Sequence, residues 1–252
     1  MSRIALLTGG ASGLGLATAK LFAEAGMTVA IVDLKADAAE RAAASLPGKG
    51  HRGFALDVSD EAGVIATFDV VEREMGPIAV LGNFAGIVVW PEDKTRPAIV
   101  KVDMAEWQKT FAVNTTGTFL CVREYLRKRT AKPVPDGRII NIASSAAQIG
   151  GYNTSVAYVA SKGAILSLTK LAAREAAPLG ITVNAISPGT IDTPLLRAVM
   201  PPEKDAAYIV NVPLARIGKP EDIANAAAFL ASPGAGYITG SCIDVNGGIR
   251  MQ

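Results

Sequence analysis

Tyr158 and Lys162 are the two residues whose types and spacing point most directly to chemistry. They lie in segment 157–162, inside a run whose pattern predicts a helix. Residues four apart share one face of a helix, so the ammonium is expected beside the phenol. A nearby cation lowers the pKa of a tyrosine from its reference of about 10, which suits a general acid–base. The alternative is an ordinary surface pair, and the rest of the chain decides between the two.

A strand, a glycine-rich turn and a helix follow one another at the start of the chain. Residues 4–7 are an apolar run typical of a strand buried on both faces, segment 8–15 is rich in glycine, and 16–25 predicts a helix ending at Gly26. Glycines let the backbone approach a pyrophosphate closely, and the N–H groups at the helix N-terminus bind it. This order of elements therefore predicts a dinucleotide site.

Asp33 gives that site its expected cofactor preference. It ends a second apolar strand, 28–32, and lies 18 residues after Gly15, near the spacing of a carboxylate that binds the adenosine ribose. A carboxylate there accepts hydrogen bonds from both ribose hydroxyls and repels a 2′-phosphate. Neither Ser12 nor Leu34 is basic, and Lys35 is too weak a signal to reverse the preference, so the sequence predicts NAD rather than NADP. The alternative is a glycine-rich turn with an exposed aspartate.

Strands and helices alternate along the remaining chain, which predicts a parallel sheet covered on both faces. We expect a single doubly wound Rossmann-type α/β domain over residues 1–252, with a seven-stranded parallel sheet. A long proline-containing segment at about 190–213 is expected to form a flap over the site. Further strands are predicted at 53–56, 78–81, 138–142, 181–186 and 241–245, and further helices at 37–46, 59–75, 103–111, 115–129, 156–177 and 220–230.

The residues that follow the predicted strands are candidates for the site. In open α/β sheets the ligand binds beyond the carboxyl ends of the strands. Gly9, Asp33, Asp57 and Asn83 all follow predicted strands.

Composition excludes several classes of function. Half of the 252 residues are apolar, 19% are charged, and the net charge is +2, with no basic block that would indicate nucleic-acid binding. Two cysteines and one histidine, His51, provide no disulfide framework, no metal cluster and no support for a serine–histidine triad. We find no signal peptide or convincing membrane span, so a soluble cytoplasmic protein is expected.

Several ordered motifs together resemble the classical short-chain dehydrogenase/reductase family, over nearly the whole chain. Segment 8–15 matches the family's TGxxxGxG, and 83–86 matches its NNAG except that Phe84 replaces an asparagine. Tyr158 and Lys162 match its YxxxK. Asn114, Ser144, the Pro188–Gly189 pair and segment 244–248 match its remaining motifs.

The resemblance implies roles for four residues in hydride transfer between an alcohol or ketone and a nicotinamide. Tyr158 would be the general acid–base, and Lys162 would lower the tyrosine's pKa and hold the nicotinamide ribose. Ser144 would donate to the substrate oxygen, and Asn114 would hold a water that relays protons. Ser145 stays an alternative to Ser144, because it has the family's spacing of thirteen residues before Tyr158, whereas the Ile-x-Ser pattern favours Ser144. Without a catalytic role, Ser144 would cap the next turn and Asn114 would satisfy a neighbouring backbone group.

The cofactor and the substrate are also assigned by resemblance. The cofactor is expected to contact Gly9, Ser12, Gly13, Leu14, Gly15, Asp33, Asp57, Val58, Asn83, Ala85, Gly86, Tyr158, Lys162, Pro188, Gly189, Ile191 and Thr193. The substrate pocket is expected among Val88, Val89, Trp90, Ile149, Tyr152, Leu195, Leu196 and Tyr208, which favours an apolar or modestly polar alcohol. Lys94 and Arg96 are more simply explained as solvated charges than as contacts for an acid at the mouth.

The leading interpretation is an NAD(H)-dependent oxidoreductase that interconverts a secondary alcohol and a ketone, acting on a small molecule, with no metal. An NADPH-dependent 3-oxoacyl-thioester reductase shares the motifs and stays an alternative. A nicotinamide-nucleotide sensor without turnover is the alternative of another class, which the retained Tyr158 and Lys162 disfavour. The resemblance also implies a homotetramer that packs through the helices 115–129 and 156–177.

Overall fold

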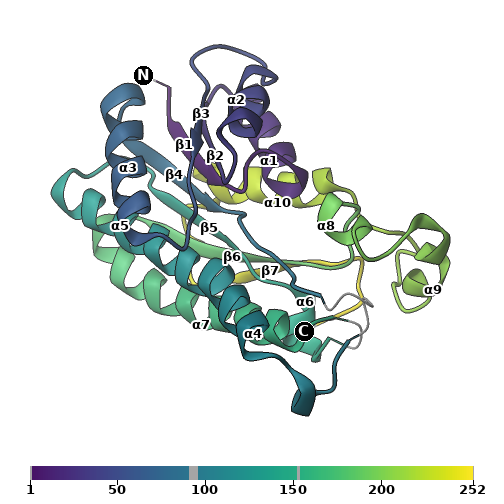
Figure 1. Ribbon diagram of the computed structural model, residues 1–252. Coiled ribbons are helices and arrows are strands. Elements are labelled where there is room, and N and C mark those ends of the chain that lie inside the picture. The colour runs from purple at the N-terminus through teal and green to yellow at the C-terminus, as the bar shows by residue number, and fades with distance from the viewer. Residues whose placement is uncertain (1, 91–95, 152–153, 252) are drawn as a thin grey trace.

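Seven parallel strands form the centre of the molecule, in the order β3-β2-β1-β4-β5-β6-β7 (Figure 1). The computed structural model describes residues 2–90, 96–151 and 154–251. The seven-stranded parallel sheet with helices on both faces confirms the predicted fold class. The strands are β1 (Ile4–Thr8), β2 (Thr28–Asp33), β3 (Arg52–Ala55), β4 (Ile78–Asn83), β5 (Arg138–Ile142), β6 (Thr182–Pro188) and β7 (Cys242–Val245).

Helices cover both faces of this sheet. On one face α1, α2 and α10 pack on the strands, and on the other α3, α5 and α7 do so (Figure 1). The helices are α1 (Gly13–Glu24), α2 (Ala36–Ala44), α3 (Glu61–Met75), α4 (Met104–Phe111), α5 (Thr118–Ala131), α6 (Ser145–Ile149), α7 (Val156–Ala176), α8 (Pro194–Arg197), α9 (Asp205–Ile209) and α10 (Pro220–Ala231).

Strand β1 shows why these apolar runs become central strands. Successive side chains point to opposite faces, so Ala5 and Leu7 join the core under α1 and α10, while Ile4 and Leu6 join the core under α3 and α5. A strand with a core on each face has to be apolar on both faces, as β1 is from Ile4 to Leu7. The short continuous runs in the sequence therefore located the strands well.

The register of the sheet brings the functional segments to one level. Thr8 at the end of β1 pairs with Val32 of β2 and with Asn83 of β4. The chain leaves β1 toward β2 and β3 on one side and returns to β4 on the other. Between β1 and β4 lies the switch in strand order where such sheets bind ligands.

Three features differ from the sequence-based prediction. The helix predicted to start at 115 begins at Thr118, because Ala112–Gly117 forms a π-helical segment. A short helix, α6, begins directly after Ser144, where no helix was predicted. The segment 190–213, predicted as a flap with no helix assigned to it, contains α8 and α9. Among the described residues, no helix combines the length and the apolar character needed to cross a bilayer.

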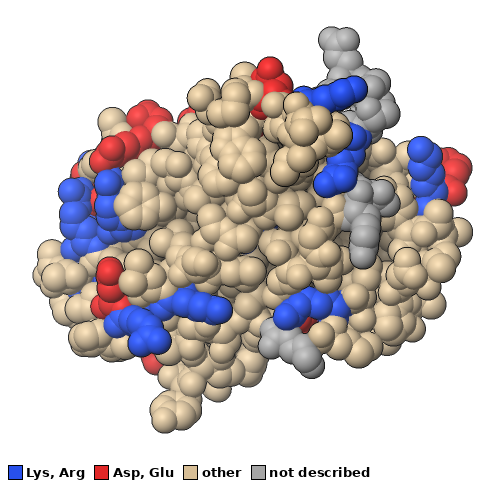
Figure 2. Space-filling view, turned by 90° about the horizontal axis from the view of Figure 1, so that it is seen from below, with Lys and Arg blue, Asp and Glu red and all other residues tan. Residues whose placement is uncertain are grey.

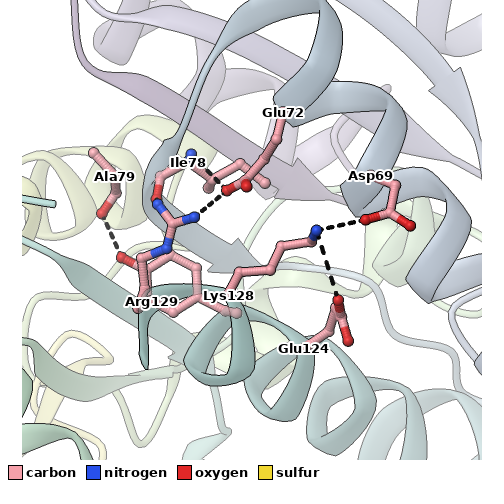
Figure 3. Close-up of polar contacts among 8 residues, drawn as sticks. Asp69, Glu72, Ile78, Ala79, Glu124, Lys128 and Arg129 are labelled. Atoms are coloured by element: carbon pink, nitrogen blue, oxygen red, sulfur yellow. Dashed lines mark hydrogen bonds and ion pairs between the residues drawn. The ribbon is translucent and has the colours of Figure 1, made fainter. Parts of the chain in front are cut away.

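A buried ion pair holds α3 and α5 together at the amino ends of the strands, the end of the sheet away from the functional segments (Figure 3). The Arg129 side chain is fully buried and donates to Glu72 and, over 2.9 Å, to the Ile78 carbonyl oxygen. The Glu72 carboxylate also accepts from the Ile78 N–H at 3.1 Å. One arginine and one glutamate thus hold both helices to the start of β4.

We expect Glu72→Ala to destabilise the protein by about 3–5 kcal/mol, because it leaves the Arg129 guanidinium buried without its partner. The matched control is Asp69→Ala, which removes the carboxylate from a solvent-facing pair with Lys128, at 2.6 Å. That pair should contribute about 1 kcal/mol or less. Urea unfolding measures both losses, and equal losses in the two variants would contradict the ranking.

Candidate active site

A cavity of about 880 Å³ opens at the carboxyl ends of the strands. It runs between the glycine-rich turn, the ends of β2 to β6 and the segment that contains α8 and α9. Among the residues predicted to bind a cofactor, those lining it are Gly9, Ser12, Gly13, Leu14, Gly15, Asp33, Asp57, Val58, Ala85, Gly86, Tyr158, Pro188, Gly189, Ile191 and Thr193.

The glycine-rich turn has room for backbone only. A Cβ at Gly9, whose φ is +62°, would lie 2.8 Å from the Ala85 Cα, and a Cβ at Gly15 would lie 2.3 Å from the Gly9 carbonyl oxygen. At the N-cap of α1, the Ser12 side chain makes no capping hydrogen bond. The first N–H groups of α1 therefore have no cap from Ser12, and the residues that carry them line the cavity. This cradle fits a pyrophosphate.

Two carboxylates lie at the neighbouring strand ends. Asp33 accepts hydrogen bonds from the N–H of Ala11 at 3.1 Å and from that of Leu34 at 2.9 Å, which ties it to the glycine-rich turn. The Asp57 carboxylate accepts from the hydroxyl and the N–H of Ser59, and these bonds hold its pKa below the usual range. Both aspartates line the cavity. A dinucleotide whose pyrophosphate lay on the turn would therefore meet acidic groups at its adenosine end.

Tyr158 lies in the first turn of α7 and lines the cavity. Burial raises the pKa of Tyr158 above its usual value, and a hydrogen bond with the Ser144 hydroxyl acts in the opposite direction. The predicted lowering of this pKa by Lys162 is wrong for this structure. The ammonium of Lys162 instead donates to the Ile142 carbonyl oxygen at 2.7 Å, and its Nζ lies 5.8 Å from the centroid of the Tyr158 ring.

Lys162 is buried behind the cavity wall rather than in it. Burial lowers the pKa of Lys162 to about 8. A Cβ added to Gly86 would lie 3.4 Å from both the Lys162 Nζ and the Asn114 Oδ1, so these two polar groups lie together behind Gly86. The structure thus brings Lys162 and Asn114 to one place, as the predicted relay requires.

Asn114 occupies the π-helical segment between α4 and α5 and is fully buried. Its Oδ1 accepts from the Ile87 N–H at 2.8 Å, and its Nδ2 donates to the Ile87 carbonyl oxygen at 3.0 Å and to the Ser161 hydroxyl at 3.1 Å. The side chain therefore satisfies a neighbouring backbone segment, which was the structural alternative for this residue. π-helical turns of this kind occur frequently at functional sites.

Ser144 and Ser145 both line the cavity at the end of β5. The Ser144 hydroxyl accepts from the Ala146 N–H at 3.2 Å and so caps α6, as its structural alternative predicted. It is also the hydroxyl that interacts with Tyr158. Of the two serines, Ser144 is therefore the one that the structure brings together with the tyrosine.

Asn83, like Lys162, is a predicted contact that does not line the cavity. Its side chain is buried in the sheet, where the Nδ2 donates to the Asn141 side-chain oxygen at 2.8 Å, and it does not line the cavity. The turn that follows Asn83 is instead held by the Phe84 N–H, which donates to the Thr8 carbonyl oxygen at 3.1 Å.

The other end of the cavity is mainly apolar. Of the predicted substrate contacts, Val88, Trp90, Ile149, Leu195, Leu196 and Tyr208 line it and Val89 does not, while Tyr152 and Lys94 fall outside the described residues. The exposed Arg96 donates to the Thr154 carbonyl oxygen at 3.1 Å. Met200, Asn211 and Ile249 also line the cavity but were not predicted, because neither a motif nor a strand end marks them.

Neither a metal centre nor a histidine-based site is found in the part of the chain that the structure describes. No group of three or more histidine, cysteine or acidic residues there could hold a metal ion. His51 accepts from the Val29 N–H at 3.0 Å near the start of β2, at the sheet edge opposite the cavity.

Comparison with known proteins identifies close relatives along the whole chain. A family model described as enoyl-(acyl carrier protein) reductase matches residues 9–250. The chain is 38% identical to cis-4-hydroxycyclohexanecarboxylate dehydrogenase from Sinomonas cyclohexanicum, over 98% of this chain and 96% of that protein.

Two solved structures share the fold closely. The 3-ketoacyl-(acyl-carrier-protein) reductase from Brucella melitensis, complexed with NADH, is 35% identical, with a TM-score of 0.88 over 99% of this chain and 98% of that one. A short-chain type dehydrogenase/reductase from Mycobacterium marinum is 32% identical, with a TM-score of 0.90 over 99% and 96% of the two chains.

Proposed function

Because the chain belongs to the short-chain dehydrogenase/reductase family, we propose that it is an NAD(H)-dependent enzyme that interconverts a secondary alcohol and a ketone. One observation carries the proposal. One cavity extends from the glycine-rich turn and Asp33 to Tyr158 and Ser144. It continues into its mainly apolar end, which we call the apolar chamber. A dinucleotide bound along the turn would extend toward Tyr158, where the alcohol carbon must meet the nicotinamide.

The proposed cofactor is NAD. Asp33 lines the cavity beside the turn, where its carboxylate suits ribose hydroxyls and opposes a 2′-phosphate. Among the described lining residues, Lys109 of α4 is the only lysine or arginine, and Lys35 is not among them. A structural neighbour described as complexed with NADH supports the same preference.

The protein's own groups supply binding and proton transfer. When bound, the nicotinamide accepts or supplies the hydride. The Tyr158 phenolate oxygen takes the proton from the substrate alcohol, and in the reverse direction the phenol gives a proton to the ketone oxygen. The Ser144 hydroxyl donates to that same oxygen, where negative charge develops during hydride transfer. Lys162 would bind the nicotinamide ribose if its ammonium turned from the Ile142 carbonyl oxygen toward the cavity, and Asn114 would hold a water that connects Lys162 to solvent.

The proposed substrate is a small, largely apolar secondary alcohol or its ketone. Aliphatic and aromatic side chains form most of the chamber next to Tyr158, with Tyr208 and Asn211 as polar groups. The relative that acts on a hydroxycyclohexanecarboxylate supports a compact ring or branched alcohol. A 3-oxoacyl thioester is the second candidate, because the Brucella neighbour is described as a 3-ketoacyl reductase.

We expect a panel of secondary alcohols with NAD to produce reduced nicotinamide, seen by its absorbance. The efficiency kcat/KM with NAD should exceed that with NADP at least tenfold, an order of magnitude worth about 1.4 kcal/mol. Turnover confined to NADPH and 3-oxoacyl thioesters would instead support the second candidate. Tight nucleotide binding with no turnover of any panel member would support a sensor.

We further propose a single domain over residues 1–252, with the segment 190–213 as a flap, and a homotetramer. A Cβ at Gly13 would lie 3.6 Å from the Thr193 side chain, so this segment reaches the glycine-rich turn. Figure 2 shows a broad face with few charges, on the side where α4 and α7 lie in Figure 1. Phe119 of α5 and Leu171 of α7 are exposed apolar residues that subunit packing would cover. A cytoplasmic location stays a prediction from the sequence.

A further inference from the structure

Helix α6 has one face toward the cavity and another toward the sheet. Ser145, Ala146 and Ile149 line the cavity, whereas Gln148 points to the end of β6. The helix has five residues, which is too short for stability on its own. It ends at Gly150, whose φ is +84°, followed by Gly151 at +51°. The position of α6, and of Ser144 at its N-cap, must therefore come from anchors to the rest of the fold.

Gln148 is the polar anchor of α6. Its side-chain amide lies 2.8 Å from the Ser187 hydroxyl of β6. When the amide is oriented to satisfy all its neighbours, its nitrogen donates to Ser187 and, over 2.9 Å, to Asp244 of β7. Its oxygen then accepts from the Arg250 guanidinium at 3.2 Å. One side chain thus joins α6 to two strands and to the C-terminal segment.

Arg250 completes this anchor from the other end of the chain. Its guanidinium pairs with the Asp244 carboxylate, and both side chains are largely buried. Its carbonyl oxygen accepts from the Asn246 side chain at 3.3 Å. The neighbouring residue Ile249 lines the catalytic cavity. The Gln148–Arg250 contact therefore connects two walls of that cavity.

None of the anchoring side chains touches the catalytic cavity itself. Gln148 and Arg250 instead line a separate cavity of about 540 Å³, together with Cys242 and Lys170. Ser187, which Gln148 contacts, immediately precedes Pro188 and Gly189 in the cavity wall. A substitution at Gln148 can therefore reach the reaction only by moving α6, the end of β6 or the C-terminal segment at Ile249.

We propose that Gln148, held by Arg250, is a positioning residue that sets the place of the Ser144 hydroxyl relative to Tyr158. The inference rests on the proposed function, because it assigns Ser144 its role in hydride transfer. Geometry of this kind matters because a displacement of about 1 Å at a reacting group can cost about 100-fold in rate. A partial shift of α6 should cost less than removal of Ser144.

The test is a double-mutant cycle of Gln148→Leu and Ser144→Ala, measured as kcat and as KM for NAD. We expect Gln148→Leu alone to lower kcat about tenfold with little change in KM for NAD, because the glycine-rich turn is untouched. In the Ser144→Ala background the same change should have almost no further effect, since both act through one hydroxyl. Gln108→Leu on α4, which also replaces a helical glutamine by leucine, should keep the wild-type kcat.

A second measurement does not depend on turnover. Amide hydrogen exchange of a peptide covering 143–150 should be faster in Gln148→Leu, while the peptide covering 8–25 should exchange as in the wild type. Arg250→Met should accelerate exchange in the same 143–150 peptide. Unchanged exchange there, or equal acceleration over the whole chain, would overturn the proposal.

The outcomes separate this inference from the proposed function. If the wild type oxidises an alcohol and Gln148→Leu has the wild-type kcat, the inference fails and the function stands. Fully multiplicative losses in the double variant would also overturn it, because Gln148 would then act independently of Ser144. If the wild type shows no turnover, the function fails, and the exchange of 143–150 still decides whether Gln148 anchors α6.

Discussion

Replacement of Tyr158 by Phe is expected to lower kcat by about 1,000-fold, within the range of 100- to 10,000-fold that a positioned acid–base contributes. The change removes the only oxygen of the side chain and keeps the ring that lines the cavity. Fluorescence titration with NADH should give a dissociation constant within about threefold of the wild type, since the cradle at Gly9 and Gly15 and the acid Asp33 remain. Stopped turnover with preserved binding is the signature of a lost proton carrier.

The control for this variant is Tyr237→Phe, because Tyr237 is fully exposed and lies outside the cavity. It should keep the wild-type kcat and KM. Turnover of Tyr158→Phe within a few-fold of the wild type would contradict the assignment of the acid–base. A loss of NADH binding in proportion to kcat would also contradict it, because Tyr158 would then serve binding rather than chemistry.

The pH dependence of the wild type follows from the same residue. Burial raises the pKa of Tyr158, and the Ser144 hydroxyl only partly opposes this. Alcohol oxidation needs the phenolate as base, so its rate should rise with pH through that pKa. Ketone reduction needs the protonated phenol and should be favoured on the acidic side. We therefore expect kcat to rise with pH for oxidation and to fall with pH for reduction in the wild type. Both dependences should disappear in Tyr158→Phe.

The arrangement of the strands could be predicted from the sequence because parallel strands are buried on both faces. Each strand had to be apolar at successive positions, as Ala5, Leu6 and Leu7 are. Short apolar runs therefore indicated both that a segment is a strand and where it lies in the sequence. The glycine-rich turn was equally accessible, because Gly9 and Gly15 leave no room for a Cβ. Backbone constraints of this kind act locally and leave a direct trace in the sequence.

Side-chain directions were less predictable, because contacts between distant segments decide them. Helical spacing placed Lys162 on the same helix face as Tyr158, but its ammonium donates a hydrogen bond to the Ile142 carbonyl oxygen of β5. Asn83 was expected at the cavity because it ends a strand, yet Asn141 of the adjacent strand binds it. Both differences arise from hydrogen bonds to residues of β5, which is distant in the sequence, so the local pattern carries no signal for them.

Irregular backbone was also missed for a physical reason. The π-helical segment at Ala112–Gly117 contains Asn114, whose side chain bonds to Ile87 in the loop after β4. Helix α6 is too short for a periodic pattern, and tertiary contacts such as that of Gln148 hold it. These local structures exist only in the folded protein, and both lie beside the candidate catalytic residues.

Replacement of Asp33 by Asn is expected to shift the cofactor preference about 100-fold toward NADP, measured as the ratio of kcat/KM for NAD to that for NADP. The change keeps the shape of the side chain and an oxygen for the Ala11 N–H, so the glycine-rich turn should stay in place. It removes the negative charge that favours two ribose hydroxyls and repels a 2′-phosphate. Hydrogen bonds to charged groups are worth about 1.5–3 kcal/mol, and about 2.7 kcal/mol corresponds to 100-fold.

Asp37→Asn is the matched control for that shift. Asp37 is an acid in the first turn of α2, four residues further along the chain, and it pairs with Arg41 on the exposed surface at 2.8 Å. It does not line the cavity, so removal of its charge should leave the cofactor ratio within about twofold of the wild type. An equal shift in both variants would mean that general acidity, and not the Asp33 carboxylate, sets the preference. No shift in Asp33→Asn would place the discrimination elsewhere in the cavity and remove the main support for NAD.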